Sequence, residues 1–246
     1  MNGVSMNSIK PSLKNNIHSA SIIKTNFYHY FFRVFATYPD ESFIGLTEKL
    51  VPYFEQLKKF IFNNDYSSSI FILKNYIETE KESYKEDDDT FLEYMQDLYF
   101  ELFLDKLTFI PSNATSYFSA YGDLKNRELD NVINIYEINN FTSYLDTEIE
   151  ADHVSTEMQY MQQLNSLLKK QIEEDEDASL IITNLQAQYN FLQGHILPWF
   201  EEFAIYLREQ VEHPEGNLYY AVVGIINEFI KYDKNLVEEF IESIKD

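Results

Sequence analysis

The residues best placed to do chemistry lie in one short stretch of the chain, Glu150-Ala151-Asp152-His153. A Glu-x-x-His spacing puts a carboxylate and an imidazole on one face of a helix, as in the metal sites of di-iron helical bundles. Those sites need a second Glu-x-x-His motif and two further inward glutamates, and this sequence holds only one such motif. The spacing therefore predicts no metal site.

Other patterns that carry catalysis are also missing from the sequence. There is no G-x-G-x-x-G, no G-x-x-x-x-G-K-[ST] and no H-E-x-x-H. Cysteine is absent, which excludes disulfides, cysteine-ligated zinc, iron–sulfur clusters and thiol nucleophiles. A Ser–His–Asp triad stays open, because a triad is recognised by geometry, although nothing resembles a nucleophile elbow. We therefore predict a protein that is not an enzyme and has no cofactor.

The charge of the chain narrows the choice of partners. A formal net charge of -22 argues against nucleic acid, whose phosphates require clustered Lys and Arg, and it disfavours anionic membranes. An acidic surface attracts basic partners, although solubility alone explains the charge equally well. No window approaches the roughly 18 apolar residues that span a bilayer, and residues 1–25 lack the apolar core of a secretory signal. We expect a cytoplasmic protein without stable membrane insertion.

The elements that must position the Glu-x-x-His stretch are expected to be helices. Only 6 Gly and 6 Pro punctuate the chain, and no strand pattern alternates with the helical ones. The clearest amphipathic pattern has seven apolar residues on one helical face: Phe91, Leu92, Met95, Leu98, Tyr99, Leu102 and Phe103. We predict an all-α, single-domain bundle of about ten helices over residues 21–246, after a flexible polar arm at 1–20, with a possible hinge at 140–152.

Turn and cap signals place the other helices. They are expected at about 22–37, 41–64 with a break at Pro52, 67–80 with Ser67 as cap, 123–139, from 153 to an acidic loop at 173–177, 178–195, 198–211, 217–231 and 234–245. Residues 105–122 read as a long loop that carries aromatic side chains. At the start of the helix after 152, we expect Asp152 to be the N-cap and His153 to lie in the first turn beside Glu157.

The stretch around this expected cap is similar to a signature of one family. The TorD/DmsD/NarJ family of redox-enzyme maturation chaperones carries a motif close to E-P-D-H-x-x-x-E-L-x-x-M. This sequence supplies its polar and terminal positions in register, as Glu150, Asp152, His153, Glu157 and Met161. It departs from the motif at Ala151, where the family usually has Pro, and at Met158, where Leu is common.

Four further segments resemble the same family in the same order, so that the resemblance covers roughly residues 25–230. They are Arg33 to Pro39, Tyr99-Phe100-Glu101-Leu102-Phe103, His195-Ile196-Leu197-Pro198-Trp199, and Glu212-His213-Pro214 with Tyr219 and Gly224 after it. Within the motifs, we expect a mainly structural role for Glu150, Met161, His195, Pro198, Trp199, His213 and Pro214.

The resemblance implies a chaperone that binds the twin-arginine signal peptide and the apo form of a molybdoenzyme catalytic subunit. It would assist insertion of the molybdenum cofactor and prevent premature export. Two adjacent arginines followed by an apolar segment call for carboxylates beside an aromatic-lined groove. The residues expected to bind the signal peptide are Asp152, His153, Glu157, Tyr99, Leu102, Phe103, Tyr117 and Tyr121.

Several alternatives stay open at the level of sequence. The first alternative is a leaderless molybdoenzyme subunit as the client, as for NarJ-like chaperones. The second alternative is a helical binder of nucleotides or other small molecules, since the resemblance implies weak guanine nucleotide binding in some members. The sequence does not name the client, and it allows a monomer or a domain-swapped dimer.

Overall fold

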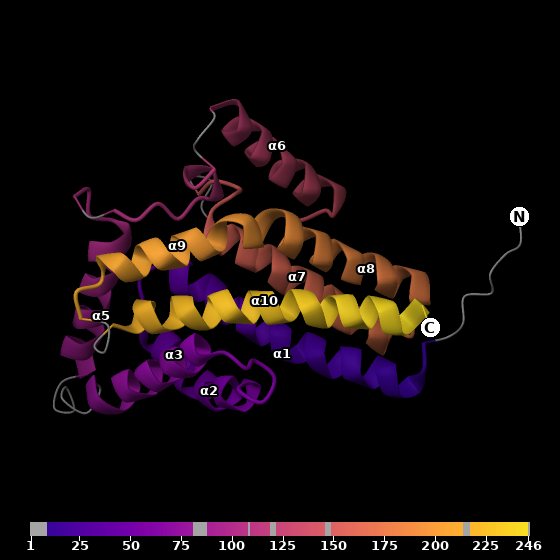
Figure 1. The fold of residues 1–246 in the computed structure, drawn as a ribbon, viewed down its shortest axis with the longest axis horizontal. Coiled ribbons are helices and arrows are strands. Elements are labelled where there is room, and N and C mark those ends of the chain that lie inside the picture. Colours follow the sequence, from indigo (N-terminus) through magenta and orange to yellow (C-terminus); the bar gives the residue numbers. More distant parts are fainter. Residues whose placement is uncertain are drawn as a thin grey trace, which may run out of the picture.

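The chain folds into α-helices that pack side by side in a computed structural model (Figure 1). The structure describes residues 9–80, 88–107, 109–118, 122–145, 149–213 and 217–245. Within these ranges the only β pairing is an isolated bridge between Asn113 and His153. The predicted all-α fold is confirmed. No described helix is both long and apolar enough to cross a membrane.

Figure 1 shows the long helix α10 running across the face of the bundle, with α8 and α9 on one side and α1, α2 and α3 on the other. The elements, in chain order, are α1 (Pro11–Ala36), α2 (Glu41–Leu57), α3 (Asn64–Asn75), the π-helical turn η1 (Tyr76–Glu80), α5 (Asp88–Phe103), the 3-10 turn η2 (Ala114–Ser116), α6 (Gly122–Ile138), α7 (Val154–Glu173), α8 (Ala178–Phe191), the π-helical turn η3 (Leu192–Ile196), α9 (Leu197–Gln210) and α10 (Leu218–Lys245).

Aromatic rings fill the centre of the bundle. Phe27 of α1 lies 4.8 Å from Phe54 of α2 and 5.2 Å from Phe229 of α10, measured between ring centroids. Such tilted and edge-on pairs are worth about 0.5–1.5 kcal/mol each beyond the area that they bury. The helix predicted from its apolar stripe is also present as α5, with the largest residues of the stripe buried in this core. The aromatic-rich composition is therefore spent mainly on the core.

The first helix begins at Pro11, so the flexible arm expected at residues 1–20 is wrong from residue 11 onward. The reason is a second apolar cluster at the far end of the bundle, where Ile17 packs among residues of α7, α8 and α10. Ile9 and Leu13 pack against the same cluster. Polar residues between these positions hide an amphipathic helix from a composition-based reading. Residues 1–8 lie outside the described residues.

Two predicted boundaries near the start of the chain are also wrong. Pro52 lies inside α2 and does not break it, because the proline is exposed while Leu50 and Phe54 on the inner face stay buried. The next helix begins at Asn64 with Asn63 as its cap, whose side-chain oxygen accepts from the Asp65 amide at 2.7 Å. Asn ranks among the best N-cap residues, and it stands earlier in the chain than the predicted cap, Ser67.

The two helices predicted at 217–231 and 234–245 are one continuous helix, α10. The predicted break falls at Asp233, which is fully buried and paired with Lys24 of α1, whose Nζ lies 2.7 Å from its Oδ1. The Tyr28 hydroxyl donates to the other carboxylate oxygen at 2.6 Å, and Lys24 also donates to Gln188 of α8 at 2.6 Å. Burial lowers the pKa of Lys24, and the charge of Asp233 opposes that shift. A local reading cannot foresee this pairing across the bundle.

A second cation, Arg208 in the last turn of α9, joins three helices of the bundle. Arg208 donates two hydrogen bonds of 2.8 Å to the carboxylate of Asp65 on α3, and its Nε donates to the Tyr220 carbonyl on α10 at 3.1 Å. Its remaining nitrogen donates to Ser69 at 2.6 Å. A side chain at Gly224 would overlap this guanidinium, so the glycine of the motif region makes room for it.

Removing one member of the buried ion pair should destabilise the protein more than removing both. Lys24→Met leaves the Asp233 charge buried without its cation, and we expect a loss of about 3–5 kcal/mol in the free energy of unfolding. The double variant Lys24→Met with Asp233→Leu should recover most of that loss. Urea unfolding followed by circular dichroism measures both. Equal stability of the single and double variants would contradict the role assigned to the pair.

Candidate functional site

The Asp152 carboxylate joins the loop after α5 to the start of α7. It is 1% exposed, and its Oδ2 accepts a hydrogen bond from the Thr115 amide at 2.8 Å. Its Oδ1 accepts from the Asn113 side chain at 3.2 Å. The backbone adds two hydrogen bonds, from the Ala114 amide to the Asp152 carbonyl at 3.0 Å and from the Val154 amide to the Ser112 carbonyl at 2.8 Å. The loop is therefore held against α7 by both main chain and side chain.

The predicted N-cap, Asp152, is wrong, because the cap of α7 is His153. The His153 Nδ1 accepts from the Ser155 amide at 3.2 Å and lies 2.6 Å from the Ser155 hydroxyl. Burial lowers the pKa of His153 to about 4, although the nearby Asp152 charge opposes the shift. The imidazole is therefore neutral at physiological pH, and Asp152 is free to serve the loop instead of the helix.

Glu157 lies one turn into α7 and is fully buried. Its Oε2 accepts from the indole nitrogen of Trp199 on α9 at 3.2 Å, while its Oε1 has no hydrogen-bond partner. Burial, reinforced by the Asp152 charge, raises the pKa of Glu157 well above its ordinary value, and the Trp199 hydrogen bond only partly opposes that shift. Burial therefore favours the protonated form of this glutamate, which accepts from the indole and fixes its position.

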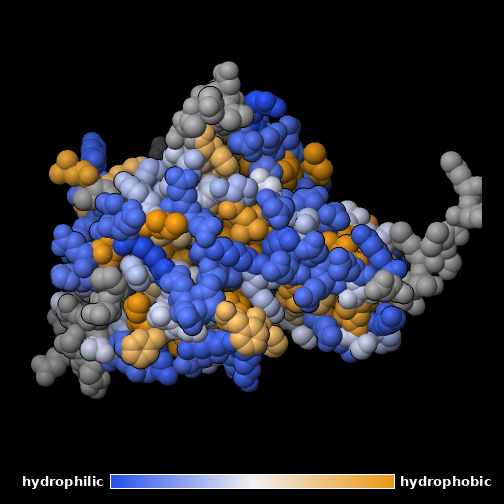
Figure 2. All heavy atoms as spheres, in the orientation of Figure 1, coloured by the Kyte–Doolittle hydropathy of each residue, from blue (hydrophilic) through white to orange (hydrophobic). Residues whose placement is uncertain are grey.

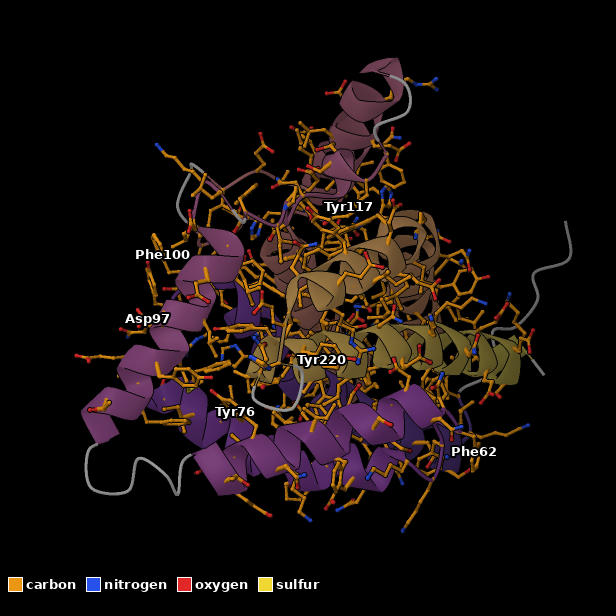
Figure 3. All side chains as sticks on the ribbon, turned by 60° about the vertical axis from the view of Figure 1, so that its left-hand side comes forward. Phe62, Tyr76, Asp97, Phe100, Tyr117 and Tyr220 are labelled. Carbon is orange, nitrogen blue, oxygen red and sulfur yellow. The ribbon has the colours of Figure 1, made fainter. Side chains whose placement is uncertain are left out.

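The Trp199 indole in turn positions the loop that carries Tyr117. Trp199 stacks against Tyr117 with ring centroids 5.6 Å apart and the planes tilted by 30°. The Tyr117 hydroxyl donates to the Pro111 carbonyl at 2.8 Å, which closes the loop on itself. Figure 3 shows Tyr117 where the loop meets α9. Glu157 and Trp199 of the sequence motifs thus form one continuous chain of contacts with Tyr117 of the loop.

The other residues predicted to bind the signal peptide lie mostly beneath the surface. The Tyr99 hydroxyl donates to the Phe35 carbonyl at 3.2 Å. Phe103 packs its ring against Phe35 at 5.8 Å and Tyr219 at 5.4 Å. Leu102 is buried as well, although it lines a groove described below. Tyr121 lies outside the described residues.

The motif residues given a structural role are distributed along the bundle. Glu150 accepts from the Asn113 side chain at 2.8 Å and so also holds the loop. Met161 is buried in the core. His195 packs on Phe191 with ring centroids 5.2 Å apart, and burial lowers its pKa. Pro198 stands in the first turn of α9, His213 is exposed at the edge of a groove, and Pro214 lies outside the described residues.

A groove of about 390 Å³ opens where the Tyr117 loop meets α9. We call it the α9 groove, and it is lined by Pro111, Ser116, Tyr117, Glu202, Ile205, Tyr206 and Glu209. The four residues from α9 follow the spacing of one helical face, opposite the face that buries Trp199 and Phe203. Ile205 and Tyr206 are exposed, with a carboxylate one turn to either side. The groove is therefore both apolar and acidic.

A second groove of about 410 Å³ lies between α5 and the turn that leads into α10. We call it the α5 groove, and it is lined by Tyr94, Leu98, Glu101, Leu102, Asp105, Gln210, Val211, Glu212, His213 and Asn217. Its acidic residues come from two separate segments of the chain. Gln210 of the α5 groove directly follows Glu209 of the α9 groove, so the two grooves lie at the same end of α9.

The sequence analysis missed the α9 residues of this site. Glu202, Ile205, Tyr206 and Glu209 belong to no motif, and the prediction of a helix over 198–211 gave them no role. A signal was nevertheless present, because two apolar residues between glutamates on the outer face of a helix are unusual for a purely solvated surface. Among the described residues, no three His, Asp or Glu side chains gather as metal ligands would.

An acidic, aromatic-walled groove at one end of an all-helical domain is chemically suited to a basic and apolar peptide or protein segment. The comparison with protein families identifies one family within this class of helical domains. Residues 62–204, more than half of the chain, match the family of the nitrate reductase delta subunit, and the chain belongs to this family. The family is that of the NarJ/TorD/DmsD chaperones, which assemble molybdoenzymes and are not catalysts. Searches of curated proteins and of solved structures found no significant match.

Replacing the buried glutamate with its neutral amide should stabilise the protein at neutral pH. Because the folded state raises the pKa of Glu157, its contribution to stability is full below the unfolded pKa and is lost as the pH rises toward the folded value. Glu157→Gln removes this loss, about 1.4 kcal/mol for every pKa unit of the shift. Thermal unfolding should place the variant above the wild type at pH 7.5 and bring the two together near pH 4.5.

Proposed function

We propose that this protein is a cytoplasmic chaperone that binds the twin-arginine leader and the apo form of a molybdoenzyme catalytic subunit. It would hold the subunit while the molybdenum cofactor is inserted and delay its export until then. Membership of the NarJ/TorD/DmsD family supports the binding of a molybdoenzyme subunit. The observation that supports binding of the leader itself is the chemistry of the α9 groove.

The α9 groove fits a leader of this type in both of its parts. Glu202 and Glu209 stand seven residues apart on α9, which is about 10 Å along a helix, with Ile205 and Tyr206 between them. Carboxylates of this kind pair with guanidinium groups by charge-assisted hydrogen bonds. The apolar segment that follows the arginines would lie on Ile205, Tyr206 and the ring of Tyr117. A groove with these two chemistries side by side favours an arginine-bearing apolar segment over an uncharged one.

The sequence motif then acts from below the groove. Asp152 and Glu157 are too deeply buried to meet an arginine in the described arrangement. Asp152 holds the loop that carries Tyr117, and Glu157 fixes the indole on which that ring rests. We therefore assign Asp152, His153 and Glu157 to positioning the groove, and Tyr117 to direct contact. Tyr99, Leu102 and Phe103 support the same end of the bundle from within the core.

A leaderless client is the second candidate function. The α5 groove favours it, because this groove is separate, carries its own carboxylates and could hold a basic segment of a mature subunit. Mass spectrometry of the partner captured from the native host separates the two functions. A precursor with its leader intact supports the first, and a subunit without a leader supports the second.

Binding of the leader should depend on the two glutamates of the α9 groove. We expect a twin-arginine leader peptide to bind and the double variant Glu202→Gln with Glu209→Gln to bind about fivefold to thirtyfold more weakly, because exposed and charge-assisted pairs together contribute about 1–2 kcal/mol. Isothermal titration calorimetry measures both. The matched control is Glu239→Gln with Glu242→Gln on α10, which removes the same charge from exposed positions elsewhere.

Two controls show which feature of the leader the groove recognises. A twin-lysine leader should bind more weakly than the twin-arginine one, since lysine lacks the planar fork that pairs with a carboxylate. Higher ionic strength should also weaken binding, because exposed charges are screened beyond about 8–10 Å near physiological salt. Affinity that is unchanged in the Glu202/Glu209 variant, or lowered equally in the Glu239/Glu242 control variant, would contradict the proposed groove.

The positioning role of Asp152 makes a different prediction from direct contact. Asp152→Asn keeps an oxygen that accepts from the Thr115 amide but removes the charge, so it should keep leader affinity within about threefold. Asp152→Ala releases the loop and should lower both leader affinity and thermal stability, the latter by about 1–3 kcal/mol. If the asparagine variant binds as poorly as the alanine variant while it unfolds like the wild type, Asp152 contacts the leader directly.

A further inference from the structure

The connection between α2 and α3 carries an exposed cluster that the client-binding site does not use. Its residues are Lys58-Lys59-Phe60-Ile61-Phe62, which we call the Lys–Phe turn. Ile61 is buried and anchors the turn, whereas Phe60 is 61% exposed and Phe62 is 91% exposed. Figure 3 shows Phe62 at the edge of the molecule, well away from Tyr117 and Phe100.

Phe60 and Phe62 contribute little to the packing of the fold. Phe60 makes one distant ring contact, 6.4 Å from Tyr232, and Phe62 is almost fully solvated. Tyr53, on the outer face of α2, is exposed as well. Figure 2 shows hydrophobic side chains at the lower edge of the molecule, where Figure 1 places α2 and α3. Apolar surface that projects outward in this way is left for a partner or a surface to cover.

The charge of the turn is opposite to that of the whole protein. Three carboxylates border it, and each has its own cation: Asp65 pairs with Arg208 at 2.8 Å, Glu55 with Lys74 at 3.3 Å and Glu228 with Lys231 at 3.0 Å. In the part of the chain that the structure describes, Lys58 and Lys59 have no carboxylate within ion-pair distance. Two adjacent ammonium groups therefore remain uncompensated beside the exposed rings.

We propose that the Lys–Phe turn docks the protein weakly and reversibly on an anionic membrane surface. Lysines meet the lipid phosphates, and the phenyl rings enter the boundary between headgroups and acyl chains. Tyr53 would lie at headgroup level, where tyrosine is favoured. A projecting turn suits insertion better than it suits a peptide partner, which needs a concave wall to lie in.

The net charge of -22 does not oppose this docking as strongly as it first suggests. At physiological salt a charge is felt over about 8–10 Å, so the membrane meets the turn and its paired neighbours before the rest of the acidic surface. The same screening limits docking to one orientation, with the turn toward the lipid. The α9 groove then stays open to solvent, because Tyr117 and Phe62 lie on different sides of the molecule (Figure 3).

Cosedimentation with lipid vesicles tests the proposal on the full-length protein. The wild type should pellet with vesicles of phosphatidylcholine mixed with phosphatidylglycerol and stay in solution with phosphatidylcholine alone. Lys58→Ser with Lys59→Ser should lose about tenfold or more in partitioning, since each lysine near an anionic surface contributes roughly a fivefold factor. Phe60→Ser with Phe62→Ser should lose binding to the same vesicles.

The chain offers matched controls for both changes. Lys169→Ser with Lys170→Ser removes another adjacent lysine pair, from α7, and Phe100→Ser removes another exposed ring, from α5, which lies well away from Phe62 (Figure 3). Both controls should bind the anionic vesicles like the wild type. Absence of wild-type binding, or equal losses in the control and turn variants, would overturn the proposal. Capture of an acidic protein by the turn without any vesicle binding would overturn it too, in favour of a protein partner.

Discussion

The buried carboxylate of Asp152 is the constraint on which the end of this molecule depends. A carboxylate away from water is costly unless its oxygens accept hydrogen bonds, and here the donors come from Asn113 and Thr115 in a loop that precedes it by many residues. Moving the loop away would leave the buried carboxylate without these donors, and the free-energy cost of that state holds the loop in place. Because the loop carries Tyr117, the shape of the α9 groove follows from a residue that never reaches its surface.

Beneath the same groove, Glu157 and Trp199 form a second layer of support. A buried glutamate that accepts from the indole and an indole that stacks on Tyr117 give the wall a fixed orientation. The protein accepts a stability cost at neutral pH for keeping this acid buried, which is the pattern expected at sites where position matters more than stability. In the proposed function, the family motif therefore supports the binding surface from beneath.

The sequence could predict what depends on local pattern. The stripe from Phe91 to Phe103 marked α5, the family motif marked the start of α7, and both elements stand where they were expected. The cap of α7 could not be predicted, because the true partner of Asp152, the Thr115 amide, is 37 residues away. The prediction of a break in α10 failed for the same reason, because the partner that allows Asp233 to be buried, Lys24, is far away in the sequence. The grooves were missed for another reason: exposure on α9 depends on what the loop leaves uncovered.

Arg208 fixes the far end of α9 to both α3 and α10 through Asp65, Ser69 and the Tyr220 carbonyl. The helix that forms one wall of the α9 groove is therefore tied to two other helices, and in the proposed function this wall is preorganised before the leader arrives. The entropy lost on association then falls almost wholly on the incoming chain, which orders itself on a rigid template. Such a division of cost favours moderate affinity with rapid exchange, so that a holding protein can hand its cargo onward without having to unfold any part of itself.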